Sequence, residues 1–158
     1  MFPEDKAQAL KETVRVLKPG GVLIATYWVD VQFLKLLSEV MTAVIGSTPP
    51  PPPANPMSLA ESGLFDQLAI DAGFNRCVTE YDAYPFNLGR DTDFQYKLTT
   101  MLVKDKLDEL DAHAVARQAL FEKLPKYSYM GDNGDVMLGP NRFAMALAYK
   151  VGNPHLGK

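Results

Sequence analysis

The chain has 158 residues, of which 47% are hydrophobic and 22% are charged, a composition that fits one globular domain and excludes wholesale disorder. Its formal net charge of −3 argues against a nucleic-acid partner, because such proteins carry a basic patch. A single cysteine, Cys77, excludes an internal disulfide and a thiolate metal cluster. No apolar run is long enough to cross a bilayer and no secretory signal opens the chain, so we expect a cytoplasmic protein with no membrane partner.

The first predicted element is a helix that starts at residues 3–5, Pro-Glu-Asp. Proline suits a first helical turn, and acidic side chains complement the positive end of the helix dipole. Apolar residues recur at helical spacing until Lys18-Pro19-Gly20-Gly21 ends the helix. The run from Val22 to Trp28 is almost continuously apolar, which predicts a strand buried on both faces, as in parallel sheets. The chain therefore opens with the helix and strand of a β-α-β unit whose first strand is absent.

A second apolar helix is predicted over residues 31–45, ending at Gly46, and a proline-rich connector over residues 46–57 follows it. Five consecutive prolines, 49–53, favour a stiff, extended polyproline conformation. Two interpretations are open: a ligand for an SH3, WW or profilin-like partner, or a spacer between two helices. No arginine flanks the run, which favours the spacer.

The middle of the chain predicts a helix followed by a strand. Ser58 and Glu61 form a capping-box pattern, so we expect a helix over residues 59–72 that ends at Gly73. Residues 76–84 alternate loosely between apolar and polar, which predicts a strand with one partly exposed face. Pro85 is expected to end this strand.

A less regular helical pattern over residues 87–141 predicts a helical insertion, with one of its helices ended by Pro125. The turn at 131–135 offers oxygen ligands but lacks a calcium-binding loop, so we interpret it as a plain turn. Residues 143–151 then alternate large side chains with Ala144, Ala146 and Ala148. This pattern predicts a strand whose small-residue face lets another layer approach closely.

Individual residues give no convincing catalytic group and no metal site. His113 and His155 lie far apart in charged or terminal segments and are interpreted as surface residues. Cys77 is interpreted as a half-buried strand thiol, and Asp108 with its acidic neighbours as a solvated helix face. Gly20-Gly21 lies between a helix and a strand, which is the wrong order for a phosphate-binding loop. No catalytic residue is assigned.

One string points to a family. Residues 2–23, which contain R-V-L-K-P-G-G, resemble the segment of class I S-adenosylmethionine-dependent methyltransferases in which a helix leads into the fifth strand. Ala72-Gly73-Phe74 resembles the family's penultimate strand unit, and residues 134–149 resemble the closing strand of the subgroup that acts on small molecules. The resemblance implies a single partial α/β domain over residues 1–158, the C-terminal part of a Rossmann-like methyltransferase sheet. It would contain one buried parallel strand, an antiparallel closing pair and helical lid insertions.

The resemblance also implies a function, methyl transfer from S-adenosylmethionine to a small-molecule acceptor by in-line displacement. Phe2 is expected near the cofactor, and Tyr27 and Trp28 are expected to line the substrate side at the carboxyl end of their strand. Packing of Tyr27 and Trp28 in the core is the competing interpretation. Residues 31–45 and 87–130 would form a lid over the substrate.

The chain departs from the family in its first half. The glycine-rich cofactor loop and the acidic residue that ends the second strand have no counterpart. We therefore expect either the C-terminal portion of a longer enzyme, inactive alone, or a sheet completed by a homodimer or a strand swap through its exposed edge. The alternative function is a non-catalytic, methyltransferase-derived interaction module that uses this edge or the polyproline run. The methyl acceptor is not identified by the sequence.

Overall fold

The computed structural model describes residues 3–50 and 55–152, which divide into two compact units. The first unit contains residues 3–30, 55–82 and 142–152, and the second contains residues 31–50 and 83–141. Residues 51–54 of the proline-rich connector lie outside the described residues.

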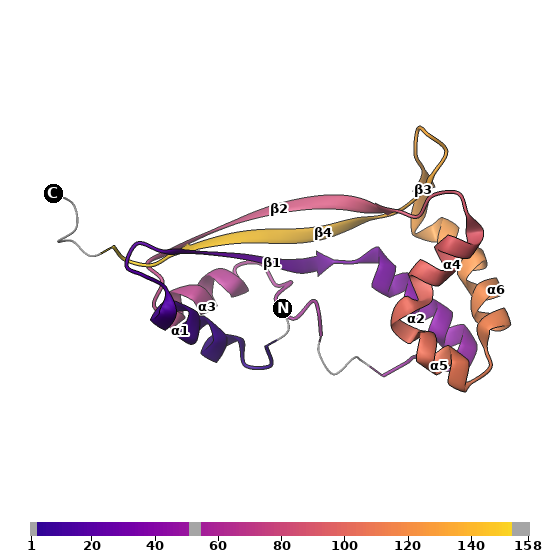
Figure 1. Cartoon of the computed structure of the whole chain (residues 1–158), viewed down its shortest axis with the longest axis horizontal. Coiled ribbons are helices and arrows are strands. Elements are labelled where there is room, and N and C mark those ends of the chain that lie inside the picture. Colours follow the sequence, from indigo (N-terminus) through magenta and orange to yellow (C-terminus); the bar gives the residue numbers. More distant parts are fainter. Residues whose placement is uncertain (1–2, 51–54, 153–158) are drawn as a thin grey trace. The chain divides into compact units, whose positions relative to one another are not determined.

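The described residues contain both helices and strands (Figure 1). The first unit holds α1 (Lys6–Val16), β1 (Val22–Asp30) and α3 (Leu64–Ala72). The second unit holds α2 (Gln32–Ile45), α4 (Thr92–Thr100), α5 (Lys104–Glu109), α6 (His113–Lys123) and β3 (Ser128–Met130), with short 3₁₀ helices η1 (Met101–Val103) and η2 (Leu124–Lys126). Two long strands, β2 (Arg76–Asn87) and β4 (Val136–Tyr149), contribute residues to both units.

The strands form a mixed α/β arrangement around a four-stranded antiparallel sheet of order β1-β4-β2, in which β3 pairs with β4. β1 and β4 pair without interruption from Val22 opposite Tyr149 to Trp28 opposite Phe143, and a register shift follows before Asp30. The α/β class is thus confirmed. No strand runs parallel to β1 beside it in the described residues, where β1 pairs only with β4.

One face of the first unit's sheet carries the core, and this inner face is covered by α1 and α3 (Figure 1). Ala144, Ala146 and Ala148 are fully buried there, which confirms the prediction that the alanine face of this strand lets another layer approach closely. The other buried members of the core are Leu10, Tyr27, Leu59, Phe65, Ala69 and Phe74.

The opposite face of the same sheet is more open, so the prediction that residues 22–28 are buried on both faces is wrong. Burial alternates along β1, and the Ile24 side chain is 65% exposed. The physical reason is that α1 and α3 cover a single face of the sheet. The residues of this outer face of β1 and β4 are Val22, Ile24, Thr26, Trp28, Phe143, Met145, Leu147 and Tyr149.

The limits predicted for the first helix are confirmed. Asp5 caps α1 by accepting a hydrogen bond from the Gln8 amide at 2.8 Å. At the other end, Lys150 Nζ donates to the carbonyl oxygens of Val14 at 2.5 Å and Leu17 at 2.6 Å. A cation at a helix C-terminus satisfies carbonyl groups that have no helical partner.

The third helix begins later than the capping-box pattern predicts. α3 starts at Leu64, after Gly63 in the left-handed conformation with φ +79°, and residues 56–63 form turns instead. The Ser58 hydroxyl has no hydrogen-bond partner in the described structure. Leu59 is buried in the core, so this segment is held by packing rather than by helical hydrogen bonds. The predicted end at Gly73 is confirmed.

The prediction that Pro85 ends the second strand is also wrong. β2 continues through Pro85 to Asn87. β2 lies at an edge of the β1-β4-β2 order, where a residue without an amide N–H costs no ladder hydrogen bond if that position faces away from the neighbouring strand.

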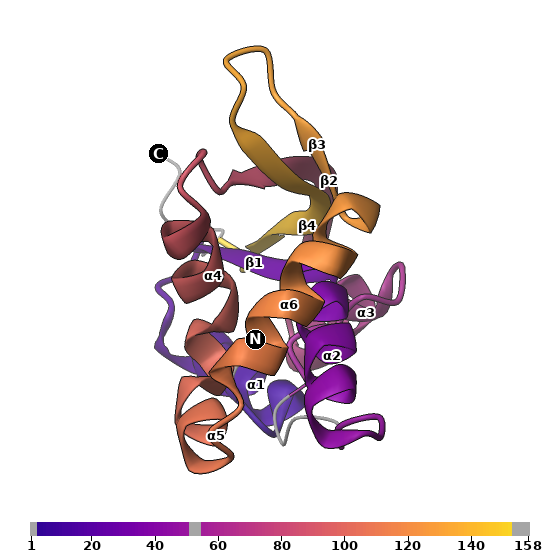
Figure 2. The same ribbon diagram turned by 90° about the vertical axis from the view of Figure 1, so that its right-hand side faces the viewer.

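The second unit contains the helices of the predicted insertion, together with strand segments. α2 is confirmed, with Gly46 as its C-cap in the left-handed conformation, and α6 packs against it (Figure 2). Residues 128–130 and 136–141, predicted as part of the helical insertion, instead form β3 and the start of β4. Glu39 Oε1 on α2 accepts hydrogen bonds from the Tyr127 hydroxyl at 2.6 Å and from Lys126.

Candidate functional site

Tyr27, one of the predicted substrate-side residues, lies in the core of the first unit. Its ring stacks on Phe65 of α3, with 5.4 Å between ring centroids. Burial, and after it the neighbouring Tyr81, raise the pKa of Tyr27 to about 12 against the opposing effect of a hydrogen bond with Thr79. Tyr27 is therefore a neutral phenol at physiological pH, within the core on the inner face.

Cys77 belongs to the same inner-face group. The Thr79 hydroxyl donates to Asp66 of α3, and Cys77 also interacts with this carboxylate. Burial, followed by hydrogen bonding to Asp66, raises the pKa of the Cys77 thiol to about 11. A nucleophilic thiol needs a lowered pKa, so this environment opposes nucleophilic chemistry at Cys77 and agrees with its interpretation as a strand thiol.

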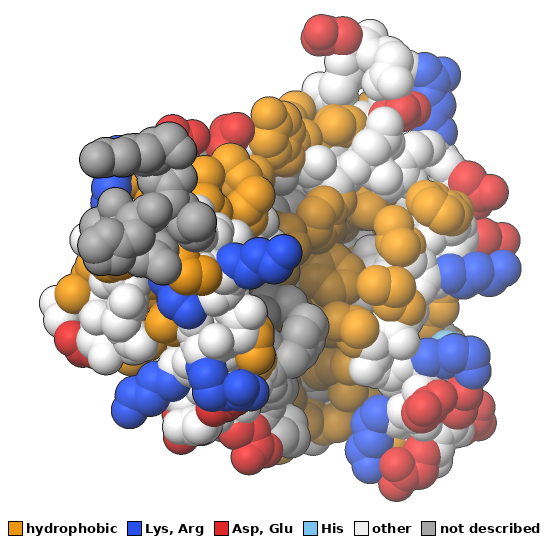
Figure 3. All heavy atoms as spheres, turned by 60° about the vertical axis from the view of Figure 1, so that its left-hand side comes forward, with side chains coloured by type: hydrophobic (Ala, Val, Ile, Leu, Met, Phe, Trp, Pro, Cys, Tyr) orange, Lys and Arg blue, Asp and Glu red, His pale blue; other side chains and the backbone are white. Residues whose placement is uncertain are grey.

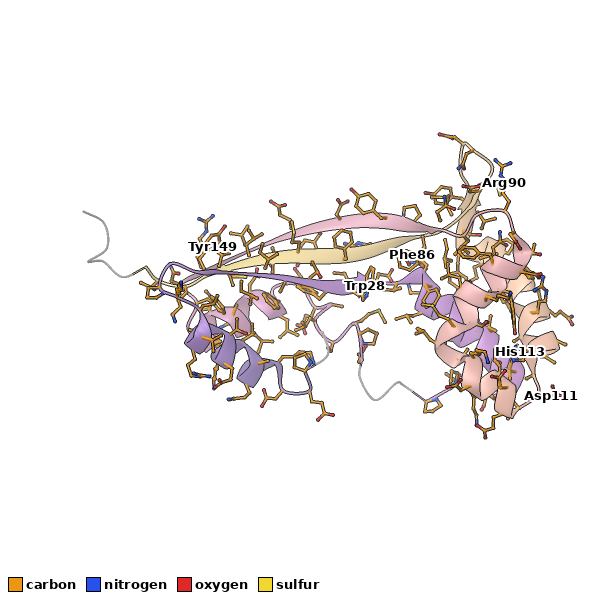
Figure 4. All side chains as sticks on the ribbon, in the orientation of Figure 1. Trp28, Phe86, Arg90, Asp111, His113 and Tyr149 are labelled. Atoms are coloured by element: carbon orange, nitrogen blue, oxygen red, sulfur yellow. The ribbon has the colours of Figure 1, made fainter. Side chains whose placement is uncertain are left out.

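Trp28 lies on the face opposite to Tyr27, because successive side chains of a strand alternate (Figure 4). Its ring makes an edge-to-face contact with Phe143 of β4, with 6.3 Å between centroids and an interplanar angle of 81°. The structure therefore does not bring Tyr27 and Trp28 to one surface. Phe2, the predicted cofactor contact, lies outside the described residues.

In the second unit, the start of α2 is tied to the strands by Asn141, which is buried. Its side-chain oxygen accepts from the Phe33 amide at 3.4 Å, and its side-chain nitrogen donates to the Leu138 carbonyl at 2.9 Å. The Phe33 ring meets Phe86 of β2 edge to face at 6.1 Å. These contacts hold the start of α2, the predicted lid helix, against residues of β2 and β4 within the second unit.

The pattern of buried and exposed residues in α4 differs from that of an ordinary surface helix. Its polar residues Gln95, Thr99 and Thr100 are buried, whereas its aromatic residue Phe94 is exposed. Phe94 is 50% exposed, and in the adjoining η1 Met101 is 56% and Leu102 is 62% exposed. A surface helix normally buries its apolar stripe. Figure 3 shows exposed hydrophobic side chains gathered in patches on the face of the molecule that it draws.

A cluster around His113 was missed by the sequence reasoning. His113, at the start of α6, places Nε2 2.6 Å from Asp108 Oδ1 and Nδ1 2.8 Å from the Tyr96 hydroxyl (Figure 4). Arg117 lies over the Tyr96 ring, 5.5 Å from its centroid. Carboxylate, imidazole and phenol thus form a chain that ties α4, α5 and α6 together. The only signal in the sequence was Asp108 five residues before the histidine, which is too common a spacing to assign a contact.

An open hollow of about 380 Å³ lies beside the turn between β3 and β4. Asn87, Tyr129 and Met137 line it together with residues 130–133 of the turn. Asp135 accepts hydrogen bonds from Asn87 at 3.0 Å and from Arg90 at 3.3 Å beside it. These contacts brace the turn, in agreement with its interpretation as a plain turn.

The described residues lack two features that would point to a function. Within residues 3–50 and 55–152, no three His, Cys, Asp or Glu side chains come together as a metal site. Over the same residues, no helix is both long enough and apolar enough to cross a membrane. The sequence matches no protein-family model and no curated protein.

Proposed function

We propose that this chain is the C-terminal portion of a class I S-adenosylmethionine-dependent methyltransferase that acts on a small molecule, and that it is not active alone. The observation that carries the proposal is the strand order β1-β4-β2. The last strand lies between β1 and β2 and runs antiparallel to β1. The adjacency of β2 and β4 supports the antiparallel closing pair that the resemblance implies. The R-V-L-K-P-G-G string lies where that resemblance requires it, from α1 into β1.

The described residues do not form a complete cofactor site. Gly20 and Gly21 connect a helix to a strand, and no glycine-rich loop leads from a strand into the N-terminus of a helix in the described part of the chain. When bound, S-adenosylmethionine supplies the activated methyl group. Its binding therefore depends on residues beyond those that the structure describes, with Phe2 proposed as a contact from this chain.

Trp28 and Tyr27 are proposed on the substrate side, in different roles. Trp28 lies near the carboxyl end of β1, the end at which ligands bind in open α/β sheets. Tyr27 is committed to the core through its stack on Phe65, so we propose that it positions this end of the strand rather than contacting the substrate.

Residues 31–45 and 87–130 are proposed as the lid over the substrate. The outward apolar stripe of α4 and η1, formed by Phe94, Met101 and Leu102, supports this role. A lid excludes water from the reaction by presenting apolar side chains to the bound substrate. The family mechanism relies on positioning and desolvation, which is consistent with the lack of an assigned acid-base residue.

The test is a calorimetric titration of S-adenosylmethionine into two proteins: the 158-residue chain, and the same chain extended by the sequence that its gene encodes before Met1. We expect the extended protein to bind and the 158-residue chain to bind far more weakly. In the extended protein, Trp28→Ala should raise the KM for the methyl acceptor, while Met145→Ala, a matched change on the same face of the sheet, should not.

Two results would contradict the proposal. The first is a gene that encodes no strand followed by a glycine-rich turn before Met1. The second is an extended, folded protein that gives no heat with S-adenosylmethionine.

The second candidate function is a non-catalytic interaction module derived from a methyltransferase. The observation that favours it is the partly exposed apolar outer face of β1 and β4, which α1 and α3 leave uncovered. Monomeric soluble proteins rarely expose a large contiguous apolar patch without a use for it. The same titration separates the two candidates, because an interaction module has no need of S-adenosylmethionine.

A further inference from the structure

The turn between β3 and β4 (Figure 1) contains the only Asn-Gly pair of the sequence, Asn133-Gly134. An asparagine side chain can lose its amide nitrogen when the backbone nitrogen of the next residue attacks it. Glycine allows this attack most readily, because it has no Cβ to hinder the approach. Every other asparagine of the chain precedes arginine, leucine or proline. Asn133 is also exposed and lines the open hollow beside the turn, so water reaches its side chain.

The folded turn opposes this reaction at both reacting groups. Attack requires the Gly134 amide to lose its proton, and in the structure this N–H donates to the Gly131 carbonyl oxygen at 2.8 Å. Attack also requires the Asn133 side chain to rotate toward Gly134. Two hydrogen bonds with Asp135 oppose that rotation. Asn133 Nδ2 donates to Asp135 Oδ2 at 2.6 Å, and Asn133 Oδ1 accepts from the Asp135 amide at 3.1 Å.

Asp135 is itself held by residues outside the turn. Its carboxylate also accepts hydrogen bonds from Asn87 at 3.0 Å and from Arg90 at 3.3 Å. Hydrogen bonds, that from Asn87 first, lower the pKa of the Asp135 carboxyl, so it is an ionised acceptor at neutral pH. The restraint on Asn133 therefore depends on contacts that join the turn to the end of β2 and to the segment that follows it.

The fold also requires the glycine that makes Asn133 reactive. Gly134 has a φ of +80°, in the left-handed region that strains a residue with a side chain. A Cβ at this position would lie 3.2 Å from Arg90 Nη2, the group that holds Asp135 from outside the turn. The closed turn thus needs glycine at 134, and the same residue exposes Asn133 to attack once the turn opens.

We propose that Asn133 is a self-modification site of this chain, and that the opening of the turn sets its rate. In the open turn, the Gly134 nitrogen gives up its proton and forms a bond to Asn133 Cγ. The Cγ–Nδ2 bond breaks, and the nitrogen leaves with that proton as ammonia. A succinimide ring between residues 133 and 134 remains. Water then opens the ring at either carbonyl, which gives aspartate or isoaspartate at position 133, with no oxidant or reductant.

The product opposes closing of the turn. A carboxylate at position 133 has no N–H to donate to Asp135 Oδ2. It also adds a third negative charge to a turn that already contains Asp132 and Asp135. Isoaspartate in addition lengthens the backbone within the turn. Opening of the turn is therefore recorded in the covalent structure of the chain.

The inference rests on the chemistry of this turn and does not rest on methyl transfer. Equal reactivity of Asn133 in the folded and unfolded chain would overturn it and leave the proposed function standing. Failure to bind S-adenosylmethionine would overturn the proposed function and leave the modification site standing.

The test compares the folded chain with the chain unfolded in guanidinium chloride, both incubated at pH 8 and the same temperature. Trypsin then releases residues 127–142, and tandem mass spectrometry measures the mass increase of deamidation at Asn133. We expect Asn133 to react at least about tenfold more slowly in the folded chain. Asn141 lies in the same peptide and precedes arginine, so it is an internal control that should stay unchanged in both samples.

Asp135→Ala removes the carboxylate that restrains Asn133. We expect this variant, shown to be folded by circular dichroism, to deamidate at least about threefold faster than the chain without substitution. Asn87→Ala is a second variant, which removes a hydrogen bond to Asp135 from outside the turn and should also speed the reaction. Asp132→Ala is the matched control, because its carboxyl makes none of these hydrogen bonds, and it should change the rate by less than about twofold.

Amide exchange tests the effect of the product. In Asn133→Asp the Gly134 amide should exchange at least about threefold faster than in the chain without substitution, and an unchanged rate would overturn the claim that the product opposes closing. Three results would overturn the modification site itself: no mass increase at Asn133 in the unfolded chain, equal rates in the folded and unfolded chain, or equal acceleration by Asp132→Ala and Asp135→Ala. The last result would show that the hydrogen bonds of Asp135 do not control the reaction.

Discussion

At the scale of single residues, burial is expected to lower the reactivity of the Cys77 thiol. Its pKa is raised to about 11 from 9.0, so at pH 8 its thiolate fraction is about a hundredth of that of an unperturbed thiol. We expect iodoacetamide to alkylate the folded chain at least tenfold more slowly than the chain in urea, measured by mass spectrometry. Because Asp66 also raises this pKa, Asp66→Asn should speed the reaction. Equal rates for folded and unfolded chains would contradict the assigned environment.

Lys150 is a residue whose role depends on a helix far from it in sequence. Its ammonium group donates to the Val14 and Leu17 carbonyls at the end of α1. Lys150→Met keeps most of the side-chain stem but removes these hydrogen bonds, so we expect the free energy of unfolding to fall by about 1–2 kcal/mol in urea denaturation. Lys11→Met, on an exposed position of α1, is the control and should change it by less than about 0.5 kcal/mol. Similar losses in both variants would show that the helix cap contributes nothing.

At the scale of elements, the exposed apolar residues of η1 differ in their expected effect on stability from the buried residues of the next helix. Leu102 in η1 is largely exposed, whereas Leu107 in α5 is fully buried. We expect Leu102→Ser to change the free energy of unfolding by less than about 0.5 kcal/mol and Leu107→Ala to lower it by about 2–5 kcal/mol. Thermal and urea denaturation of the two variants measure this difference. A loss for Leu102→Ser as large as that for Leu107→Ala would show that the stripe is covered within the folded chain.

The elements that the sequence predicted well are those with a clear local signal for at least one of their ends. α1 and α2 have such signals: an acidic N-cap for α1, a glycine C-cap for α2, and a single apolar stripe in each. The errors arise where contacts with other elements, and not the local sequence, determine where a helix or strand begins or ends. Gly63 and the burial of Leu59 moved the start of α3, and the edge position of β2 let the strand continue through Pro85. The alternation of β1 was hidden because both of its faces are apolar in sequence, although helices cover only one.

The candidate site was less predictable than the fold. Adjacent aromatic residues at a strand end suggested one surface, but strand geometry sends Tyr27 and Trp28 to opposite faces. The His113 contacts join residues from α4, α5 and α6, and no sequence spacing encodes the packing of three helices. Resemblance supplied the expected reaction, which single residues do not show because transfer by positioning needs no conspicuous acid-base pair.

At the scale of the whole molecule, acid should weaken the two units unequally. The carboxyl groups whose pKa values are lowered in the described structure all lie in the second unit, and they are Glu39, Asp91, Asp108 and Asp135. The leading causes are hydrogen bonds from Lys126 to Glu39, from the Phe94 amide to Asp91, from Lys104 to Asp108 and from Asn87 to Asp135.

A carboxyl group with a lowered pKa stabilises the folded state above its unfolded pKa, and this contribution is lost as the pH falls through its folded value. The ordinary values are 4.5 for Glu39 and 3.8 for the three aspartates, so the loss begins near pH 4.5 and continues below 3.8. We expect amide resonances of residues 83–141 to lose dispersion at higher pH than those of residues 3–30 in heteronuclear NMR spectra. In the triple variant Asp91→Asn, Asp108→Asn and Asp135→Asn, the pH values at which the two groups of resonances lose dispersion should move closer together, because an amide does not titrate. Simultaneous loss in both units, or earlier loss in the first, would show that these carboxylates do not control acid stability.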